Sequence, residues 1–536
     1  MATQWKMSSY MKGAAMLTIA ALLVKVLSAV YRVPFQNMVG DEGFYIYQQI
    51  YPLIGMITTW TSVGFAIALA KLLSDYTARE DVESVQKVKR VGFFYIGTIS
   101  IVFFLLLALS APILAEAMGD PRLSRLIQIG AVVILAMPFL ALLKSIYQVT
   151  ERLSPLAYAQ VVEQAVRVGF ILVGAHFVLS FTGDLYATGA MALLGATVGE
   201  VAGILLLGFW LTAKERNVWQ KSTSTVSTRS IIRDLTVISI SASISSLFFL
   251  MLQLVDSMTV LNTLIGNGMA LQEAKETKGI YDRVQPLIQM GIVVSTSLAF
   301  ALVPLIASKM QQNTGRGAIP FIRLSYRVAL VFGSAAALGL VVTMPYVNEM
   351  LFQTRDLSTV LMVGSVQVLW LSLLLLFMSI LQGAGRIWRP TAWLAIGVGV
   401  KLSANLWFVG EFGILGAALS GNLAMLIALF GVTFELKRTW PNALAPLTFY
   451  LHLGGALLAM AVAVIGFARI ADAVILDALP SRIQAMAIAL IGVGIGVGVF
   501  LSLLMKLQLL QPKEWYLLPF GRRLAYLQLW LTRKKG

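Results

Sequence analysis

Apolar stretches long enough to cross a bilayer alternate with short polar segments along the whole chain. A membrane-spanning helix needs about 20 consecutive, mostly apolar residues, and the pattern predicts about fourteen such helices. Six apolar stretches precede a polar segment at 214–233, and six more and a final pair follow it. The predicted spans are 13–33, 44–70, 91–114, 123–147, 156–181, 186–211, 235–264, 282–307, 321–346, 357–382, 391–409, 414–436, 450–470 and 481–505.

Two segments in the two halves of the chain are copies of one another. Residues 47–56 and 281–290, which are 234 positions apart (281 − 47), align without a gap and agree at five of ten positions. The same offset carries 145–148 onto 379–382, and Arg152 onto Arg386. A constant offset at separate places indicates a duplicated helix bundle, which is the usual architecture of secondary transporters.

The pattern and the repeat together predict an all-α polytopic membrane protein with two pseudo-symmetric six-helix lobes and a C-terminal helix pair. We expect an N-lobe at 1–213, a cytoplasmic linker at 214–233, a C-lobe at 234–437 and the helix pair at 438–506. The last segment, 507–536, interleaves aromatic residues with arginines. That composition is typical of an amphipathic segment in the membrane interface, here on the cytoplasmic side.

The composition excludes several kinds of functional site. The chain is 58% hydrophobic and 12% charged, and it has no cysteine and only two histidines. Disulfides, thiolate metal sites and histidine clusters are therefore excluded, and we expect neither a metal nor a cofactor. The first apolar stretch contains Lys25 and has no small-residue cleavage site, so we do not expect a cleaved signal peptide.

The net charge of +16 indicates membrane topology rather than nucleic-acid binding. Lysines and arginines gather in alternate loops, as they do in the cytoplasmic loops of membrane proteins. We therefore expect a multi-pass protein of the bacterial cytoplasmic membrane with both termini in the cytoplasm. Basic loops at the membrane surface also attract anionic lipid headgroups, so membrane lipids are expected partners.

Charged residues inside the predicted spans are candidates for a binding site, because a charge in the bilayer is costly and usually functional. Cations outnumber acids in the spans, which favours an anionic cargo, and arginine is well suited to pyrophosphate. Arg167 and Lys401 are 234 positions apart, so each half has a cation in its fifth span. The cations are Lys25, Arg32, Arg167, Arg283 and Lys401, and the acids are Glu163, Glu200 and Asp256.

Some of these charges also have a purely structural interpretation. Glu163 and Arg167 are four residues apart on one helical face and could form a structural ion pair. A pairing of Asp256 with Lys401 would join the seventh and eleventh spans. Arg32 and Arg283 lie near span ends, from which a long side chain reaches the membrane interface.

The chain resembles the polysaccharide-export branch of the multidrug/oligosaccharidyl-lipid/polysaccharide (MOP) superfamily, and within it the stage V sporulation protein B group and the lipid II flippases. The resemblance covers nearly the whole length. It is carried by LTIAALLVKVL at 17–27, YRVP at 31–34, VGDEGFYIY at 39–47 and YDR at 281–283.

This resemblance implies a flippase of the peptidoglycan, cell-wall or sporulation type. Such a protein moves an undecaprenyl-pyrophosphate-linked saccharide across the membrane through a cavity that opens alternately to each side. Lys25 and Arg283 match cavity cations of lipid II flippases, and Arg32 lies one residue from another. Ile50 stands where a further cavity arginine is expected.

The resemblance also bears on the coupling ion. Asp256 matches a carboxylate that helps to bind sodium in some relatives. In the eleventh span, those relatives have an asparagine and an aspartate where this chain has Lys401 and Asn405. The lysine would occupy the place of the cation, so the coupling ion stays open between a proton and sodium.

The leading hypothesis is therefore a lipid-linked saccharide flippase, a transporter without enzyme activity. A MATE-type drug or cation antiporter is the first alternative, for which we would expect an acid-dominated cavity. A membrane glycosyltransferase or polymerase is the second, but the longest outer segment, 266–281, has no constellation suited to acid–base chemistry. A non-transporting scaffold is the third, and it would not account for the buried charges.

Overall fold

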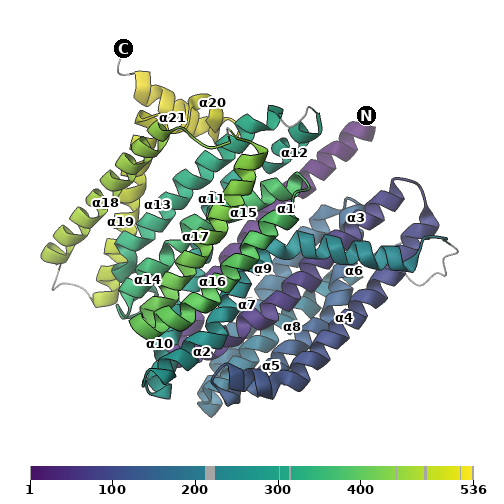
Figure 1. Cartoon of the computed structure of the whole chain (residues 1–536), viewed down its shortest axis with the longest axis horizontal. Coiled ribbons are helices and arrows are strands. Elements are labelled where there is room, and N and C mark those ends of the chain that lie inside the picture. Colours follow the sequence, from purple (N-terminus) through teal and green to yellow (C-terminus); the bar gives the residue numbers. More distant parts are fainter. Residues whose placement is uncertain are drawn as a thin grey trace. The chain divides into compact units, whose positions relative to one another are not determined.

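The computed structural model describes residues 2–211, 224–300, 302–312, 316–441, 443–475, 480–518 and 521–533. Within these ranges every regular element is a helix, as Figure 1 shows, and the predicted all-α fold is confirmed. Residues 212–223, which include the first half of the predicted linker 214–233, lie outside the described residues. The linker's last residues, from Thr228, already belong to a helix.

Twelve candidate membrane spans are found among the described residues. The first of them runs for 63 residues, from Ala15 to Thr77, and covers two of the predicted spans. Within it, Gly40 has φ +69° and ψ −172°, a conformation that only glycine adopts readily, and it breaks the helical path between the two predicted spans. The predicted eighth span is not among the twelve; the helix described there, Val284–Phe300, has 17 residues and ends next to residue 301, which lies outside the described ranges. The predicted count of fourteen is thus close but not confirmed.

The chain divides into two compact units, Met1–Asp282 and Arg283–Gly536. The predicted lobe boundaries remain a prediction. Unit 1 contains α1 (Ala2–Val30), α2 (Arg32–Thr58), η1 (Thr59–Gly64), α3 (Phe65–Thr77), α4 (Val82–Ala117), η2 (Pro121–Leu123), α5 (Ser124–Ala131), η3 (Val132–Ala136), α6 (Met137–Val149), α7 (Leu153–Thr182), α8 (Leu185–Phe209), α9 (Thr228–Gly266) and α10 (Leu271–Asp282).

In unit 2, the final helix pair packs against α13. Figure 1 shows α18 and α19 side by side in this unit. Unit 2 contains α11 (Val284–Phe300), α12 (Val303–Gln312), η4 (Arg316–Ala318), α13 (Ile319–Phe352), α14 (Ser358–Ser365), α15 (Gln367–Gly383), α16 (Trp388–Phe412), α17 (Ile414–Thr439), α18 (Leu447–Ile475), α19 (Ser481–Lys506), α20 (Pro512–Trp515) and α21 (Gly521–Arg533).

The backbone repeats the offset of 234 residues found in the sequence. After α6, Glu151 has φ +57°, and the equivalent Gly385 after α15 has φ +72°. Both turns close with the same two backbone hydrogen bonds. The N–H of Glu151 or Gly385 donates to the carbonyl three residues earlier, and the N–H of the following arginine donates to the carbonyl five residues earlier. This is the common way in which a left-handed residue ends a helix. The duplication is therefore visible in local backbone geometry as well as in sequence.

The core of unit 1 explains why α9 belongs to it. Phe65 and Leu69 of α3, Ile96 of α4 and Leu235 of α9 are buried in one apolar cluster. Other faces of these helices expose large apolar side chains such as Leu109 and Val237. In a membrane protein such exposed apolar faces are in contact with lipid.

Candidate functional site

A polar cavity of about 230 Å³ lies inside unit 1. Its walls come from the junction of α1 and α2 and from α6, α7 and α8. Apolar residues such as Ile54 and Val133 contribute to the lining, but its chemistry is set by charged and aromatic side chains. The charged lining residues are Arg32, Lys144, Glu163, Arg167 and Glu200, and the tyrosines are Tyr31, Tyr47 and Tyr51.

Arg32 forms one side of this cavity. It is the first residue of α2, directly after the turn at Tyr31, and its side chain is only 1% exposed. Its guanidinium lies 4.5 Å from the centre of the Tyr51 ring, which is a cation–π contact. The Nε and Nη1 atoms are buried, and neither has a hydrogen-bond partner in the described structure. Since buried donors are nearly always hydrogen-bonded, these two are available to a ligand.

The tyrosines next to Arg32 form an aromatic wall. The hydroxyls of Tyr31 and Tyr47 are 2.8 Å apart and share a hydrogen bond. The rings of Tyr47 and Tyr51 lie 6.2 Å apart. This arrangement fixes the ring on which the Arg32 guanidinium stacks.

The other cations of the cavity are already paired with acids. Arg167 Nη2 lies 3.1 Å from Glu200 and 3.7 Å from Glu163, and Lys144 Nζ lies 3.5 Å from Glu163. The ion pair expected from the spacing of Glu163 and Arg167 is thus formed. Three cations face two carboxylates, so the excess positive charge resides on Arg32.

Glycines on α8 allow these side chains to meet. A Cβ atom at Gly199 would lie 2.7 Å from the Glu163 carbonyl oxygen and 2.8 Å from the Cβ of Arg167. Small residues let two membrane helices approach closely. Glu200 on α8 therefore reaches Arg167 on α7 only because its neighbour has no side chain.

Arg283 belongs to unit 2 and is not among the residues that line the cavity of unit 1. It is fully buried and donates to Asn348 Oδ1 and Thr354 Oγ1, both at 2.9 Å, at the end of α13. At the equivalent position of unit 1, Gln49 donates to the Met118 carbonyl at the end of α4, at 3.3 Å. Gln49 also donates to the Ser257 carbonyl at 2.6 Å, so the two residues use different partners at equivalent positions.

Lys401 and Asn405 form a buried polar cluster in unit 2. Lys401 Nζ donates to the Ala417 carbonyl at 2.9 Å and to Ser420 Oγ at 3.1 Å, and the Ser420 hydroxyl is hydrogen-bonded to Asn405. Asp256 belongs to unit 1, where it accepts a hydrogen bond from Tyr281 at 3.1 Å. The pairing of Asp256 with Lys401 stays a prediction.

Lys25 is exposed on α1. Of the five predicted cations, the structure therefore brings Arg32 and Arg167 together, with Glu163 as the predicted charge partner. Sequence reasoning missed Lys144, although this residue lies in the predicted span 123–147 and the rule for intramembrane charges applies to it. It counted Glu200 among the buried acids without giving it a role. No group of three metal-ligating residues is found in the part of the chain that the structure describes.

The sequence profile of the "Polysaccharide biosynthesis protein" family matches residues 10–310. The uncharacterized membrane protein YabM of Bacillus subtilis (strain 168) is 35% identical over 518 residues, which are 96% of each chain. The lipid II flippase MurJ of the same organism is 24% identical over 454 residues, covering 80% of this chain and 83% of the flippase.

Solved structures of transporters share the fold. A lipid II flippase MurJ in an inward closed conformation matches with a TM-score of 0.69 at 13% identity, covering 92% of this chain and 99% of the flippase. An inward-facing MATE family multidrug transporter of the MOP superfamily matches with a TM-score of 0.56 at 14% identity, covering 77% and 94%. These relatives are flippases and transporters rather than enzymes. The chain is therefore a multi-pass membrane protein that belongs to the polysaccharide biosynthesis protein family, with the fold of MOP-superfamily transporters.

Proposed function

We propose that this protein moves a lipid-linked saccharide with an anionic pyrophosphate head, lipid II or a related precursor, across the cytoplasmic membrane by alternating access. The relationship to a lipid II flippase supports the cargo class. The observation that carries the proposal is the cavity of unit 1, in which Arg32 is buried with two donors turned to no protein acceptor.

The chemistry of the cavity suits a phosphate group. A guanidinium presents donors in a planar fork that matches phosphate oxygens, and such charge-assisted bonds are about twice as strong as neutral ones. Stacking on Tyr51 holds the fork of Arg32 in one plane. Arg167 and Lys144 stay neutralised by Glu163 and Glu200, so they position the site rather than bind an anion themselves.

The size of the cavity limits what it holds. At about 230 Å³ it lies below the 300–1,000 Å³ typical of pockets that enclose a small ligand. It therefore takes the charged part of the head, while the sugar extends outside it and the prenyl chain remains in lipid. The basic loops predicted to be cytoplasmic would make the cytoplasm the side of loading, with both termini there.

A MATE-type cation antiporter is the second candidate. The observation in its favour is that two carboxylates, Glu163 and Glu200, line the same cavity. An antiporter would use them to bind a cationic drug or a proton. In this structure both carboxylates form ion pairs with Arg167 or Lys144, which favours the anionic cargo.

The test is rescue of bacteria depleted of their only lipid II flippase. We expect the parent protein to rescue growth, and Arg32→Gln, which removes the excess charge, to fail at equal membrane abundance. Arg229→Gln is the matched control, because Arg229 is exposed at the start of α9. Rescue by Arg32→Gln equal to that of the parent would refute the role of the cavity.

The same strains separate the two candidates. If the parent does not rescue growth but lowers the accumulation of a cationic dye, and Glu200→Gln abolishes that effect, the antiporter is correct. A purified protein that moves a lipid-linked saccharide in proteoliposomes, without dye transport, would support the flippase.

A further inference from the structure

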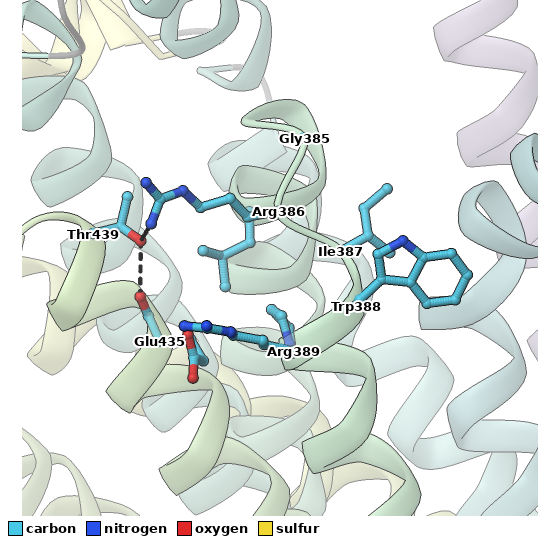
Figure 2. Close-up of a pocket in the computed structure, with 9 residues that line it drawn as sticks. Gly385, Arg386, Ile387, Trp388, Arg389, Glu435 and Thr439 are labelled. Atoms are coloured by element: carbon cyan, nitrogen blue, oxygen red, sulfur yellow. Dashed lines mark hydrogen bonds between the residues drawn. The ribbon is translucent and has the colours of Figure 1, made fainter.

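A second cavity, of about 310 Å³, lies in unit 2 at the turn between α15 and α16. Figure 2 shows that Arg386 and Arg389 both point toward the last turn of α17, where Glu435 and Thr439 are found. Leu381 supplies part of the apolar floor. None of these residues belongs to the cavity of unit 1, so a separate function has to be sought for them.

The turn holds Arg386 in a defined position. Gly385, with φ +72°, ends α15 and places Arg386 directly after it. Arg386 Nη1 donates to Thr439 Oγ1 at 2.9 Å, and this hydroxyl in turn donates to the Glu435 carbonyl at 3.0 Å. The guanidinium is thus anchored through one nitrogen and is otherwise exposed, so it keeps donors for a ligand.

The start of α16 adds to the positive potential of this cavity. The helix begins at Trp388, and Trp388, Arg389 and Pro390 all contribute to the cavity wall. The N-terminal end of a helix carries a partial positive charge and attracts anions. Arg389 therefore reinforces a potential that the backbone already provides.

The repeat shows that Arg389 and Glu435 are not needed to build the turn, whereas Arg386 has a counterpart in Arg152. The equivalent turn after α6 has the same hydrogen bonds and the same left-handed residue, at Glu151. At the positions of Trp388 and Arg389 it carries Ser154 and Pro155. After Glu200, α8 has no charged residue that would correspond to Glu435. The second copy thus has a cation, an acid and an exposed aromatic ring that the shared backbone does not require.

The position along α16 indicates where a ligand would come from. This helix has 25 residues and is about 37 Å long at 1.5 Å per residue, so it crosses the hydrocarbon core of about 30 Å. Its first residue is therefore at the membrane–water interface. Trp388, which is 65% exposed there, belongs to the residue type that anchors helices at lipid headgroups.

We propose that this cavity binds the headgroup of a membrane phospholipid, with its phosphate held by Arg386, Arg389 and the N-terminus of α16. Two arginines and one glutamate leave an excess of one positive charge, which matches the single negative charge of a phosphodiester. Arginine forks recognise phosphate oxygens with two parallel bonds. The Trp388 ring lies at the interface beside the acyl-chain region.

The test is lipid binding to the full-length, delipidated protein in detergent, measured by native mass spectrometry with phosphatidylglycerol as the probe. We expect the double variant Arg386→Gln/Arg389→Gln to weaken binding of the first lipid at least tenfold. Arg152→Gln is the matched control, because it changes the equivalent arginine of the first repeat, where the other charges are missing. The double variant should keep the parent's melting temperature, since both arginines of the cavity are exposed. The melting temperature of Arg152→Gln is measured beside it, because Arg152 is half-buried and donates to the Trp210 carbonyl at 3.3 Å.

Three results would overturn the proposal. The first is equal binding by the double variant and the parent, and the second is an equal loss in Arg152→Gln. The third is displacement of the lipid by millimolar inorganic phosphate, because the ligand would then be a soluble phosphate. Weaker binding of zwitterionic phosphatidylethanolamine than of phosphatidylglycerol is expected from the charge match. The site does not depend on the transported cargo, so loss of flipping activity alone would leave it standing.

Discussion

The short helix α10 is fastened to the rest of unit 1 by a buried ion pair, and breaking this pair should destabilise the unit. Lys275 Nζ lies 3.0 Å from Asp120 Oδ2, and the two residues are only 4% and 2% exposed. Lys275 also donates to the Tyr186 hydroxyl at 2.6 Å, and that hydroxyl donates to Asp120. The three side chains are thus joined by one ion pair and two hydrogen bonds.

Lys275→Met removes one charge and leaves the carboxylate of Asp120 buried. Removing one partner of a buried pair costs about 3–5 kcal/mol, because the remaining charge is no longer compensated. Asp120 keeps the Tyr186 hydroxyl and also accepts from the Arg122 backbone N–H at 3.2 Å, so the lower end of this range applies. A loss of about 3 kcal/mol changes the ratio of folded to unfolded protein roughly a hundredfold.

The assay is thermal unfolding of the purified full-length protein in detergent. We expect a clearly lowered melting temperature for Lys275→Met, and recovery of part of the loss in Lys275→Met/Asp120→Asn, because the double variant leaves no unpaired charge. The exposed Lys437 provides the control substitution Lys437→Met. The ion pair does not hold α10 in place if Lys275→Met has the same melting temperature as the parent. The same conclusion follows if the double variant loses more stability than the sum of the losses in the two single variants.

Three further substitutions test other parts of the fold. Gly279→Ala should strongly reduce the amount of folded protein in size-exclusion chromatography, because a Cβ there would lie 2.0 Å from the Asp41 carbonyl oxygen. Asp81→Ala should lower the melting temperature slightly, because it removes the side chain that caps the start of α4 by accepting from the Ser84 N–H. Hydrogen bonds to Ser84 lower the pKa of Asp81 below its ordinary value. The stability that Asp81 contributes is therefore present above the ordinary pKa and is lost as the pH falls through the lowered one. A difference in melting temperature between parent and variant that grew on acidification would contradict this sign. Gln528→Leu should free the C-terminal segment for limited proteolysis, because Gln528 accepts a hydrogen bond from Trp515 Nε1 at 2.8 Å; unchanged protection would exclude this role.

The features that are local in sequence could be predicted. The helical fold follows from the length of the apolar stretches, and the duplication follows from a constant offset that the turns at Glu151 and Gly385 repeat. The pairing of Glu163 with Arg167 was predictable because residues four apart share one face of a helix. Each of these inferences needs only a pattern in the sequence and no knowledge of which distant residues meet in space.

The features that depend on distant partners could not be predicted. The segment 266–281 was interpreted as a polar outer loop, whereas α10 forms there and buries both Lys275 and Lys278. A helix of 12 residues with mixed charges does not reveal which face is buried, and Asp120 is far from Lys275 in the sequence. Arg283 satisfies the rule for a buried functional cation, but the sequence does not reveal that it donates to Asn348 and Thr354, and its role in binding stays a prediction. Only the three-dimensional partners separate a structural arginine from a binding one.

The assignment of α9 and α10 to unit 1 has a consequence for biosynthesis. The duplicated sequence would let the first six spans fold as soon as they leave the ribosome, but unit 1 ends only at Asp282. At 5–20 residues per second, synthesis from Thr228 to Asp282 takes roughly 3–11 s, during which α2 and α3 lack the neighbours that cover them. A chain interrupted between the repeats would expose these surfaces to chaperones and membrane proteases, so the first six spans alone do not complete unit 1.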